Sequence, residues 1–527
     1  MRTIFKNILV GVSLATVLIS CETELDLQNP NANSLEELLQ TDDGFGFLAN
    51  GILDAYQKVP ANEFYLTELR SDNSRANSQN GNFPALSAYQ VDANNGDVAT
   101  YYSNNMHTIT HANRIIDNRF LAPESYQYAV GEAYFMRALC HFNLVRAYKN
   151  VPYIDKVLDI TQNEAYDYPQ LPEAEVYEKI IDDFKTSIAY LSGRDTDVYR
   201  PSEGAAICLA AKAYLSQPEP NYAEAELLLA SVVQNSAAFG YSLLTTSRDA
   251  STDQNSDGVI SDEEYFYELA IKFGEVFGND FTGDFTEGET VLDGSAWENT
   301  ADEKNSEVIF SIAYDLVSSD NYVTSDSGLD DQLETDSEAH SFAMTLQGPS
   351  NGVNIASSDL LQYMTPELQP VRFYANLKLN EYNAYLDDPA VDVFNNKFPT
   401  DGEIGDNDWI VLRYADVLLL YAEAILAGED STTDENALDA FNQVRARAGL
   451  TELGVLTRQE LLDERRMEFV YENQRLFDLI RFDEQDNVLT VFSVLNSLSY
   501  TPDRVYLPFP QREIDNAPGL YNQNNGY

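Results

Sequence analysis

The sequence predicts a mostly α-helical protein in which TPR-like helix pairs form a scaffold that a long, loop-rich, partly irregular insert interrupts. Two observations lead to this fold class. Apolar residues recur at three- and four-residue steps over many stretches, which is typical of amphipathic helices. These stretches come in pairs separated by short polar or proline-containing turns, and such pairs bury their apolar faces only by stacking on neighbouring pairs.

The helical pattern begins near residue 36, where Leu38, Leu39 and Phe45 start the first run. Alanine at close-packing positions, as in AAICLAAKAYL, supports helix pairs, but the match to the repeat period is loose. We therefore predict TPR-like pairs rather than a regular array. The further predicted helices lie near residues 98–119, 128–148, 173–191, 202–216, 221–235, 410–427, 434–448 and 457–482.

Residues 237–400 differ from the helical text on both sides, because they are rich in Gly, Ser, Asp and Asn. The run VIFSIAY at 308–314 predicts a short strand inside this region. Loops carried by a rigid scaffold are where binding sites usually lie, so we expect 237–400 to form the ligand side. With N-terminal helix pairs over 36–236 and C-terminal helices over 401–527, the sequence predicts one domain spanning 36–527.

The charge balance excludes several classes of protein. Acidic residues number 86 and basic residues 32, which gives a net charge of −54. Such a chain repels phosphate backbones and anionic lipid, so nucleic acid and a polybasic membrane contact are excluded. The hydrophobic fraction of 44% and the aromatic fraction of 12% suffice for a sizeable core. Cys140 and Cys208 lie in apolar helical text and are predicted to be buried thiols.

The N-terminus reads as a lipoprotein signal peptide over residues 1–20. Arg2 and Lys6 precede an apolar stretch that is too short to span a membrane. It ends in LISC, which resembles a bacterial lipobox, so Cys21 is the predicted lipid anchor and residues 21–35 the lipidated tether. The alternative is an ordinary cleaved signal with an unrelated cysteine. Several acyl chains on one cysteine give stable anchoring.

Several sequence blocks stand out along the chain: GEAYFMRA at 131–138, EVIFSI at 307–312, LRYADVLL at 412–419, NQVRARAGL at 442–450, ERRMEF at 464–469 and RLFDLIR at 475–481. The chain ends in QNNGY. These blocks, their order and this ending resemble the SusD/RagB family.

The resemblance implies a SusD-like fold and a function. Members are surface-exposed outer-membrane lipoproteins of Bacteroidetes that bind nutrients, mostly glycans, in polysaccharide utilisation. They pass the ligand to a SusC-like TonB-dependent transporter and are not enzymes. The expected partners are therefore that transporter, a glycan or oligosaccharide, and the outer membrane through the lipid anchor. Three alternatives stay open: a peptide-capturing member, an all-α glycan-processing enzyme, and a scaffold that binds only proteins.

The charged residues of the C-terminal blocks stand in apolar helical text and are predicted to form structural ion pairs. Arg465 with Glu468, and Arg475 with Asp478, have the i,i+3 spacing of helical pairs. Arginine also suits buried bidentate pairing with carboxylates. The alternative is a pocket for an anionic ligand. The residues concerned are Arg445, Arg447, Glu464, Arg465, Arg466, Glu468, Arg475, Asp478 and Arg481.

Residues 253–264, DQNSDGVISDEE, fit the twelve-residue calcium-loop template at every defined position. Gly258 allows the sharp turn, and YFYELAIKF reads as the exiting helix, whereas the entering helix is poor. We therefore predict one structural Ca²⁺ in a lone loop; the alternative is an acidic surface turn. The ligands would be Asp253, Asn255, Asp257, Val259 through its carbonyl, Ser261 through water, and Glu264.

Glycan sites combine aromatic platforms with planar polar side chains, which stack on a sugar face and bind its hydroxyls. Two regions have this composition, 72–89 and 285–325. For each aromatic residue the alternative is core or surface packing, as expected for Trp409, which is predicted to enter a helix and pack. The candidate ligand residues are Asp72, Asn73, Asn80, Phe83, Tyr89, Trp297, Tyr314 and Tyr322.

Catalytic motifs are missing from the sequence: it contains no HExxH, no GxSxG and no P-loop. Paired carboxylates cannot be singled out among 86 acidic residues. His107 and His111 are four residues apart and could share a helix face as a metal pair, although ordinary surface or packing roles are the favoured interpretation.

Overall fold

The computed structural model describes residues 35–41, 43–76, 83–158, 168–194, 197–248, 261–277, 279–281, 297–299, 304–314, 354–398 and 408–527. The chain divides into two units, Met1–Phe45 and Gly46–Tyr527. The first unit contains the short helix α2 (Leu35–Leu38), and α3 (Gly44–Thr67) begins at its end. All elements from η1 (Glu68–Arg70) onward lie in the second unit. Within the described ranges, every helix is too short or too polar to cross a bilayer.

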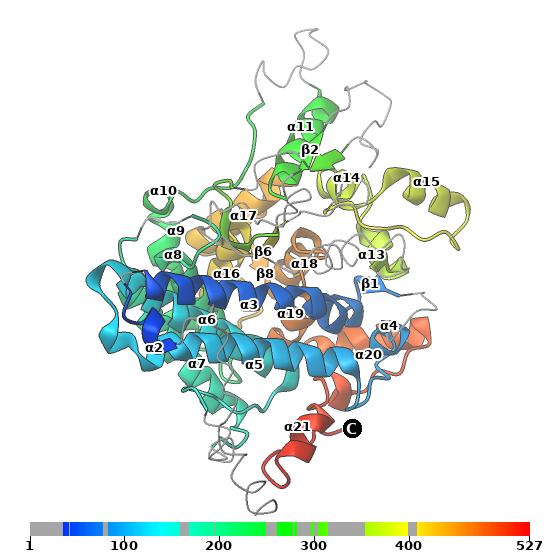
Figure 1. Cartoon of the computed structure of the whole chain (residues 1–527). Helices are drawn as coiled ribbons and strands as arrows, with labels where there is room; N and C mark the ends of the chain where they lie inside the picture. The colour runs from blue at the N-terminus through cyan, green and yellow to red at the C-terminus, as the bar shows by residue number, and fades with distance from the viewer. Residues whose placement is uncertain are drawn as a thin grey trace, which may run out of the picture. The chain divides into compact units, whose positions relative to one another are not determined.

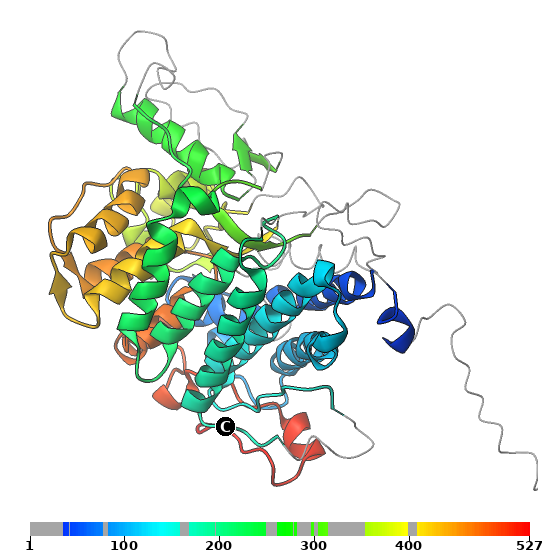
Figure 2. The same cartoon turned by 90° about the vertical axis from the view of Figure 1, so that its left-hand side faces the viewer.

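Five helices in the N-terminal half pack against one another in chain order, as Figures 1 and 2 show. This order confirms the predicted helix pairs, with bounds that differ by only a few residues. Side-chain caps explain several starts: Asn95, Ser202 and Asn221 each accept a backbone N–H of the first turn. The helices are α5 (Gly96–Asp117), α6 (Gln127–Tyr148), α7 (Glu173–Leu191), α8 (Glu203–Ser216) and α9 (Tyr222–Val233).

Small residues let these helices approach closely. A Cβ placed on Gly131 of α6 would lie 2.8 Å from Tyr190 and Leu191 of α7, so only glycine fits this crossing. Most of α6 is buried on all sides. Cys140 on α6 and Cys208 on α8 are free and buried, as predicted from their apolar surroundings.

The C-terminal part is built on a two-stranded antiparallel sheet of β4 (Val308–Ile312) and β6 (Trp409–Arg413). The strand β4 was expected from its sequence. The prediction that residues 410–413 start a helix is wrong, because they hydrogen-bond to β4. Trp409 is buried, as predicted, but lies on the strand. Helix α16 (Tyr414–Leu426) then packs on α9 and on α17 (Glu435–Arg447).

The single helix predicted over 457–482 is two helices, α18 (Arg458–Glu468) and α19 (Arg475–Arg481). The break has a backbone cause. Tyr471 and Asn473 have φ angles of 67° and 58°, in the left-handed region that a right-handed helix cannot contain. The start of α18 is set by a capping box between Thr457 and Glu460.

The remaining elements are short, and several lie in the described parts of 237–400. The predicted exiting helix is present as α11. Strand β1 pairs with β5, β2 with β3, and β7 with β8. The β1–β5 pair brings the segment after Asp72 beside α13. These elements are η1 (Glu68–Arg70), β1 (Ser74–Arg75), α4 (Phe83–Ser87), η2 (Arg119–Leu121), η3 (Glu124–Tyr126), α10 (Ser236–Phe239), α11 (Asp262–Glu275), β2 (Asn279–Phe281), β3 (Trp297–Asn299), β5 (Ile355–Ala356), α13 (Ser358–Tyr363), α14 (Arg372–Asn376), α15 (Leu379–Asp387), β7 (Ser431–Thr432), β8 (Leu456–Thr457), α20 (Gln485–Asn496), η7 (Pro502–Arg504) and α21 (Gln511–Asn516).

Candidate functional site

The family-like C-terminal blocks form a buried cluster of charges centred on Glu468, which we call the Glu468 network. Glu468 accepts from Arg413 at 2.6 Å and from Arg372 at 2.7 Å, and it also pairs with Arg447. Arg413 reaches Glu307 and Glu472, both at 2.8 Å. All side chains of the network are buried, and their opposite charges pair with one another. Its members are Glu307, Arg372, Lys397, Arg413, Arg447, Glu464, Glu468 and Glu472.

The electrostatics of this network follow from its geometry. Burial alone would raise the pKa of Glu468, but Arg447, Arg413 and Arg372 outweigh it and hold that pKa far below its usual range. Burial lowers the pKa of Lys397 to about 8, against the opposing pull of Glu472. The network therefore fastens α14, β4, β6, α17 and α18 together, which confirms a structural role for these charges.

A neighbouring set of charges joins α8, α16, α18 and α19. Arg465 lies 2.8 Å from Asp416 and 3.0 Å from Asp478, and Lys212 lies 2.8 Å from Asp416. Arg481 completes the set by pairing with Asp478 and Glu423. The buried ion pairs are thus confirmed, but the predicted i,i+3 partners are wrong.

The true partners of Arg465 and Arg475 differ from the i,i+3 partners for a simple physical reason. Arg465 contacts Asp416 and Asp478 rather than Glu468, and Arg475 contacts Asp72 rather than Asp478. Each arginine reaches carboxylates outside its own helix: Arg475 makes a bidentate contact with Asp72, and Arg465 makes one contact with each of Asp416 and Asp478. Sequence spacing records only neighbours on the same helix.

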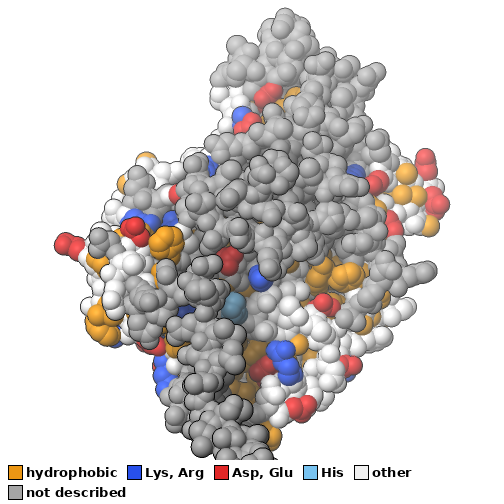
Figure 3. All heavy atoms as spheres, in the orientation of Figure 1, with side chains coloured by type: hydrophobic (Ala, Val, Ile, Leu, Met, Phe, Trp, Pro, Cys, Tyr) orange, Lys and Arg blue, Asp and Glu red, His pale blue; other side chains and the backbone are white. Residues whose placement is uncertain are grey.

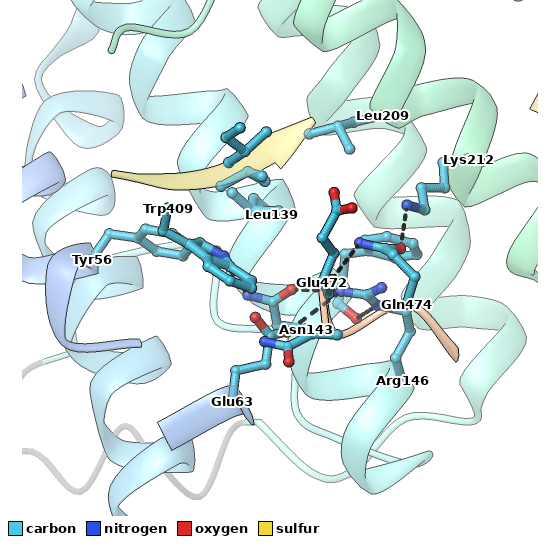
Figure 4. Close-up of a pocket in the computed structure, with 14 residues that line it drawn as sticks. Tyr56, Glu63, Leu139, Asn143, Arg146, Leu209, Lys212, Trp409, Glu472 and Gln474 are labelled. Atoms are coloured by element: carbon cyan, nitrogen blue, oxygen red, sulfur yellow. Dashed lines mark hydrogen bonds and ion pairs between the residues drawn. The ribbon is translucent and has the colours of Figure 1, made fainter. Parts of the chain in front are cut away.

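A small polar chamber lies beside these charges, and Figure 4 shows Glu63, Asn143, Arg146 and Gln474 gathered around it. Its volume is about 30 Å³. A water molecule needs roughly 10–15 Å³ on this measure, so the chamber has room for about two waters and none for a sugar. Arg146 is held between the rings of Phe142 and Phe477, at 4.1 Å from each ring centre. The chamber therefore serves the scaffold.

An open groove has a third charge cluster at its base. Arg475 donates a hydrogen bond to each carboxylate oxygen of Asp72, at 2.7 and 2.8 Å. Arg466 lies 3.1 Å from Asp72 and 2.7 Å from Asp359 of α13. Burial would raise the pKa of Asp72, but Arg466 and Arg475 hold it well below its usual range. The base of the groove is thus fixed and internally neutralised.

We call this cavity the α13–α20 groove; its volume is about 570 Å³. Ligand pockets typically measure roughly 300–1,000 Å³. Its apolar wall is unusually open, since Tyr363, Leu368 and Val491 are 51%, 51% and 59% exposed. The lining also includes amide and carboxylate side chains, among them Gln369, Gln459, Asn487, Asp359, Glu460, Asp463 and Glu464.

The groove has the chemistry of a carbohydrate site. An exposed tyrosine ring offers a flat apolar face, and amides and carboxylates offer hydrogen bonds to hydroxyls. The guanidinium of Arg466 lies 5.7 Å from the Tyr363 ring centre and supports the ring from the groove base. Burial raises the pKa of Asp463 above its usual value.

Of the residues predicted to contact ligand, Asp72 lines this groove at its base. Asn73 is buried beside it, donates to Glu68 and accepts from Arg466. Tyr89 is also buried and donates its hydroxyl to the Arg70 carbonyl. The structure therefore brings these three together, with partners inside the protein, and ligand contact by them stays a prediction.

The other predicted ligand residues lie elsewhere. Phe83 packs on Tyr65, with ring centres 4.4 Å apart. Tyr314 is buried and donates to the Gln57 carbonyl. Trp297 is on β3, opposite Phe281 of β2. Asn80 and Tyr322 lie outside the described residues.

The predicted calcium loop and lipid anchor fall mostly outside the described part of the chain. Asp253, Asn255, Asp257, Val259 and Cys21 are among the residues not described. Ser261 directly precedes α11, and Glu264 lies in its first turn. The calcium loop and the lipid anchor both stay predictions.

The groove itself was not predicted. Its wall comes from α13, α18 and α20, which meet only in the fold, since about 120 residues of sequence separate α13 from α20. One sequence signal points to it: the run VLTVFSVL at 488–495 is apolar on more than one face of a helix. In the structure, Val491, Val494 and Leu495 of α20 are accordingly 59%, 76% and 73% exposed.

Comparison with known proteins gives matches at both ends of the chain. The family model described as "SusD family" matches residues 379–527, and the one described as "Starch-binding associating with outer membrane" matches residues 25–215. SusD-like protein P2 of Formosa agariphila is 24% identical over 487 residues, which cover 87% of each chain. The starch-binding protein SusD of Bacteroides thetaiotaomicron is 33% identical over 128 residues, which are 23% of this chain and 22% of that protein.

A solved structure extends the likeness over the fold. The surface glycan-binding protein A from Bacteroides thetaiotaomicron, in complex with laminarihexaose, matches with a TM-score of 0.63 and 19% identity. The match covers 92% of this chain and 99% of that one. The predicted mostly helical fold class is therefore confirmed.

Proposed function

We propose that this chain, which belongs to the SusD/RagB family of binding proteins, captures a glycan or oligosaccharide at the cell surface and delivers it to a SusC-like TonB-dependent outer-membrane transporter. The observation that carries the proposal is the match of residues 25–215 to a family described as starch-binding and associating with the outer membrane. Because the family consists of binding proteins, the enzyme alternative falls away.

The α13–α20 groove supports glycan capture and favours a neutral glycan. Its arginines are already paired with carboxylates of the protein: Arg466 with Asp72 and Asp359, Arg475 with Asp72, and Arg445 with Glu464. The whole chain carries a net charge of −54, which repels polyanionic glycans. The remaining contacts are an exposed tyrosine ring, amides and carboxylates. This composition fits the neutral glucans named for the relatives, starch and laminarihexaose.

Titration calorimetry tests the ligand class. We expect binding to a neutral oligosaccharide such as laminarihexaose or a starch oligosaccharide, no binding to a sulfated glycan of equal length, and no release of shorter products. Retention of peptides with no binding to any glycan would instead support the peptide-capturing alternative. The exposed Leu368 and Val491 are the side chains that such peptides would contact.

The site is tested separately by Tyr363→Ala, with Phe120→Ala as the matched control. Phe120 is 77% exposed and is absent from the groove lining, so its loss removes an exposed aromatic ring elsewhere. Weaker binding in the first variant alone supports the groove as the glycan site. Unchanged binding in both variants, with glycan still bound, moves the site to the predicted loops 72–89 and 285–325.

Delivery to the transporter rests on the lipobox at Cys21 and on the family relation. We expect the protein to co-purify from outer membranes with a TonB-dependent transporter. Cys21→Ala should release it from the membrane fraction while leaving glycan binding intact. Co-purification that is absent in mild detergent would contradict the partnership.

We also propose one structural Ca²⁺ in the loop 253–264, on the strength of its ligand spacing and of the exiting helix α11. Calorimetry should detect one calcium site that Asp257→Ala removes. An unchanged calcium isotherm in that variant would contradict this loop as the site.

A further inference from the structure

Two histidines on α5 form a pair at the surface, apart from the groove. His107 is exposed and His111 half-buried, whereas His141 is buried. Figure 3 accordingly shows a histidine side chain at the surface on the side where α3 and α5 lie. The Nε2 atoms of His107 and His111 are 3.3 Å apart, and the ring centres are 4.6 Å apart.

The 3.3 Å between the two Nε2 atoms matches the distance between two nitrogen ligands of one metal ion. Zinc–nitrogen bonds of about 2.0–2.1 Å at a tetrahedral angle place two ligand nitrogens about 3.3–3.4 Å apart. The i,i+4 spacing supplies the pair from one rigid helix, so no backbone movement is needed. We propose that His107 and His111 bind a divalent transition-metal ion of the zinc class through their Nε2 atoms.

The competing role for the pair is a hydrogen bond from one Nε2–H to the other Nε2. That bond uses one Nε2 proton. If this proton moves to the Nδ1 of the same ring, both Nε2 atoms have a free lone pair in the space between the two rings. Neither ring loses a net proton in this change. The metal therefore competes with a single hydrogen bond, worth about 0.5–1.5 kcal/mol net in proteins.

The charges around the pair come from α3 and from α5 itself. Asp54 and Lys58 of α3 act on His107 with opposite signs, and Arg114 of α5 repels protons from both rings. Burial, Lys58 and Arg114 lower the pKa of His107, and burial, followed by Arg114 and His107, lowers the pKa of His111 to about 4. Both shifts favour the neutral imidazole, the form in which histidine ligates a metal.

The pair is a two-ligand site with open positions. Among the residues that the structure describes, no group of three His, Cys, Asp or Glu side chains is arranged to hold a metal. Water would fill the remaining positions. Such a site differs from a structural zinc site, which is closed by four protein ligands, and it predicts reversible binding. By ligand type, Cu²⁺ should bind more tightly than Ni²⁺ or Zn²⁺.

The test is a Zn²⁺ titration of the full chain in excess Ca²⁺, so that the many carboxylates are occupied by a hard cation. We expect one zinc site, lost or weakened about tenfold or more in His107→Ala and in His111→Ala. Lys58→Met removes a repelling charge and should tighten the site. With Cu²⁺, electron paramagnetic resonance should show nitrogen ligands in the wild type and fewer in each variant.

The proposal is overturned if both single variants bind Zn²⁺ as the wild type does, or if Cu²⁺ shows only oxygen ligands. Circular dichroism of each variant checks that the fold is retained. The double variant His107→Gln/His111→Gln, which keeps polar side chains at both positions, should also lose the site. Zinc binding that survives in this folded double variant contradicts the assignment as well.

Discussion

Arg465 and Arg466 are neighbours on α18, yet they serve two different regions. Arg465 is fully buried and contacts Asp416 and Asp478 inside the scaffold. Arg466 reaches Asp72 and Asp359 at the base of the α13–α20 groove. The inner region, which comprises the Glu468 network and the charges around Arg465, is buried, and its charges balance one another. The outer region is the α13–α20 groove, where an aromatic ring and amides are exposed to solvent. A block of sequence that matches a family can thus specify the scaffold on one face of a helix and, on the other face, border the groove that we propose as the ligand site.

The largest expected effect comes from breaking the inner region at its centre. Glu468→Gln removes the charge that Arg372, Arg413 and Arg447 share. Removing one partner of a buried ion cluster costs about 3–5 kcal/mol, because the other charges stay buried. Chemical denaturation measures the loss in free energy of unfolding. A loss below about 1 kcal/mol would show that the network is not what holds these helices.

The second effect is the pH dependence of the free energy of unfolding. Glu68 and Asp72 change this free energy in opposite directions as pH rises. The folded pKa of Asp72 is depressed, so its stabilising contribution is present above its unfolded value, near pH 4, and is lost as pH falls further. Burial raises the folded pKa of Glu68 to about 7, so ionising it costs stability as pH rises from about 4.5 to 7.

Glu68→Gln should therefore stabilise the protein at pH 7 by up to about 3 kcal/mol and flatten its stability between pH 5 and 7. A glutamine keeps the oxygen that accepts from Asn73 and from the Tyr471 backbone. Unfolding curves at several pH values measure both changes. An unaltered pH dependence would mean that Glu68 is not the group that titrates there.

A substitution in the outer region should weaken glycan binding and leave the free energy of unfolding nearly unchanged. Tyr363 is 51% exposed, so Tyr363→Ala should leave the free energy of unfolding within about 0.5 kcal/mol. Loss of its stacking face should cost about 0.5–1.5 kcal/mol of glycan binding, or roughly two- to tenfold in Kd. Calorimetry beside denaturation separates the two quantities. A large stability loss would place Tyr363 in the scaffold.

The smallest effect is expected at a surface ion pair. Arg458 and Glu484 are 3.3 Å apart, and their side chains are 32% and 26% exposed. Glu484→Gln should change the free energy of unfolding by only about 0–1 kcal/mol. This variant is the exposed counterpart of Glu468→Gln, and similar losses in both would erase the distinction between inner and outer charges.

The helices and the buried charges were predictable because each leaves a local pattern. The 3.6-residue period located α5 to α9, and arginines in apolar text pointed to ion pairs. The partners were not predictable. Asp72 meets Arg475 only after the chain has folded across 403 positions, and β6 becomes a strand only because β4 lies beside it. The groove escaped prediction for the same reason, since Tyr363, Gln459 and Val491 share no local pattern.

We propose that a neutral glycan binds the α13–α20 groove, whose base is neutralised by internal ion pairs. Calorimetric titration of the full chain and of Tyr363→Ala with laminarihexaose examines this proposal. We expect binding by the wild type, weaker binding by the variant, and an unchanged unfolding midpoint. Binding of equal strength in both proteins, or preference for a sulfated glycan, would contradict it.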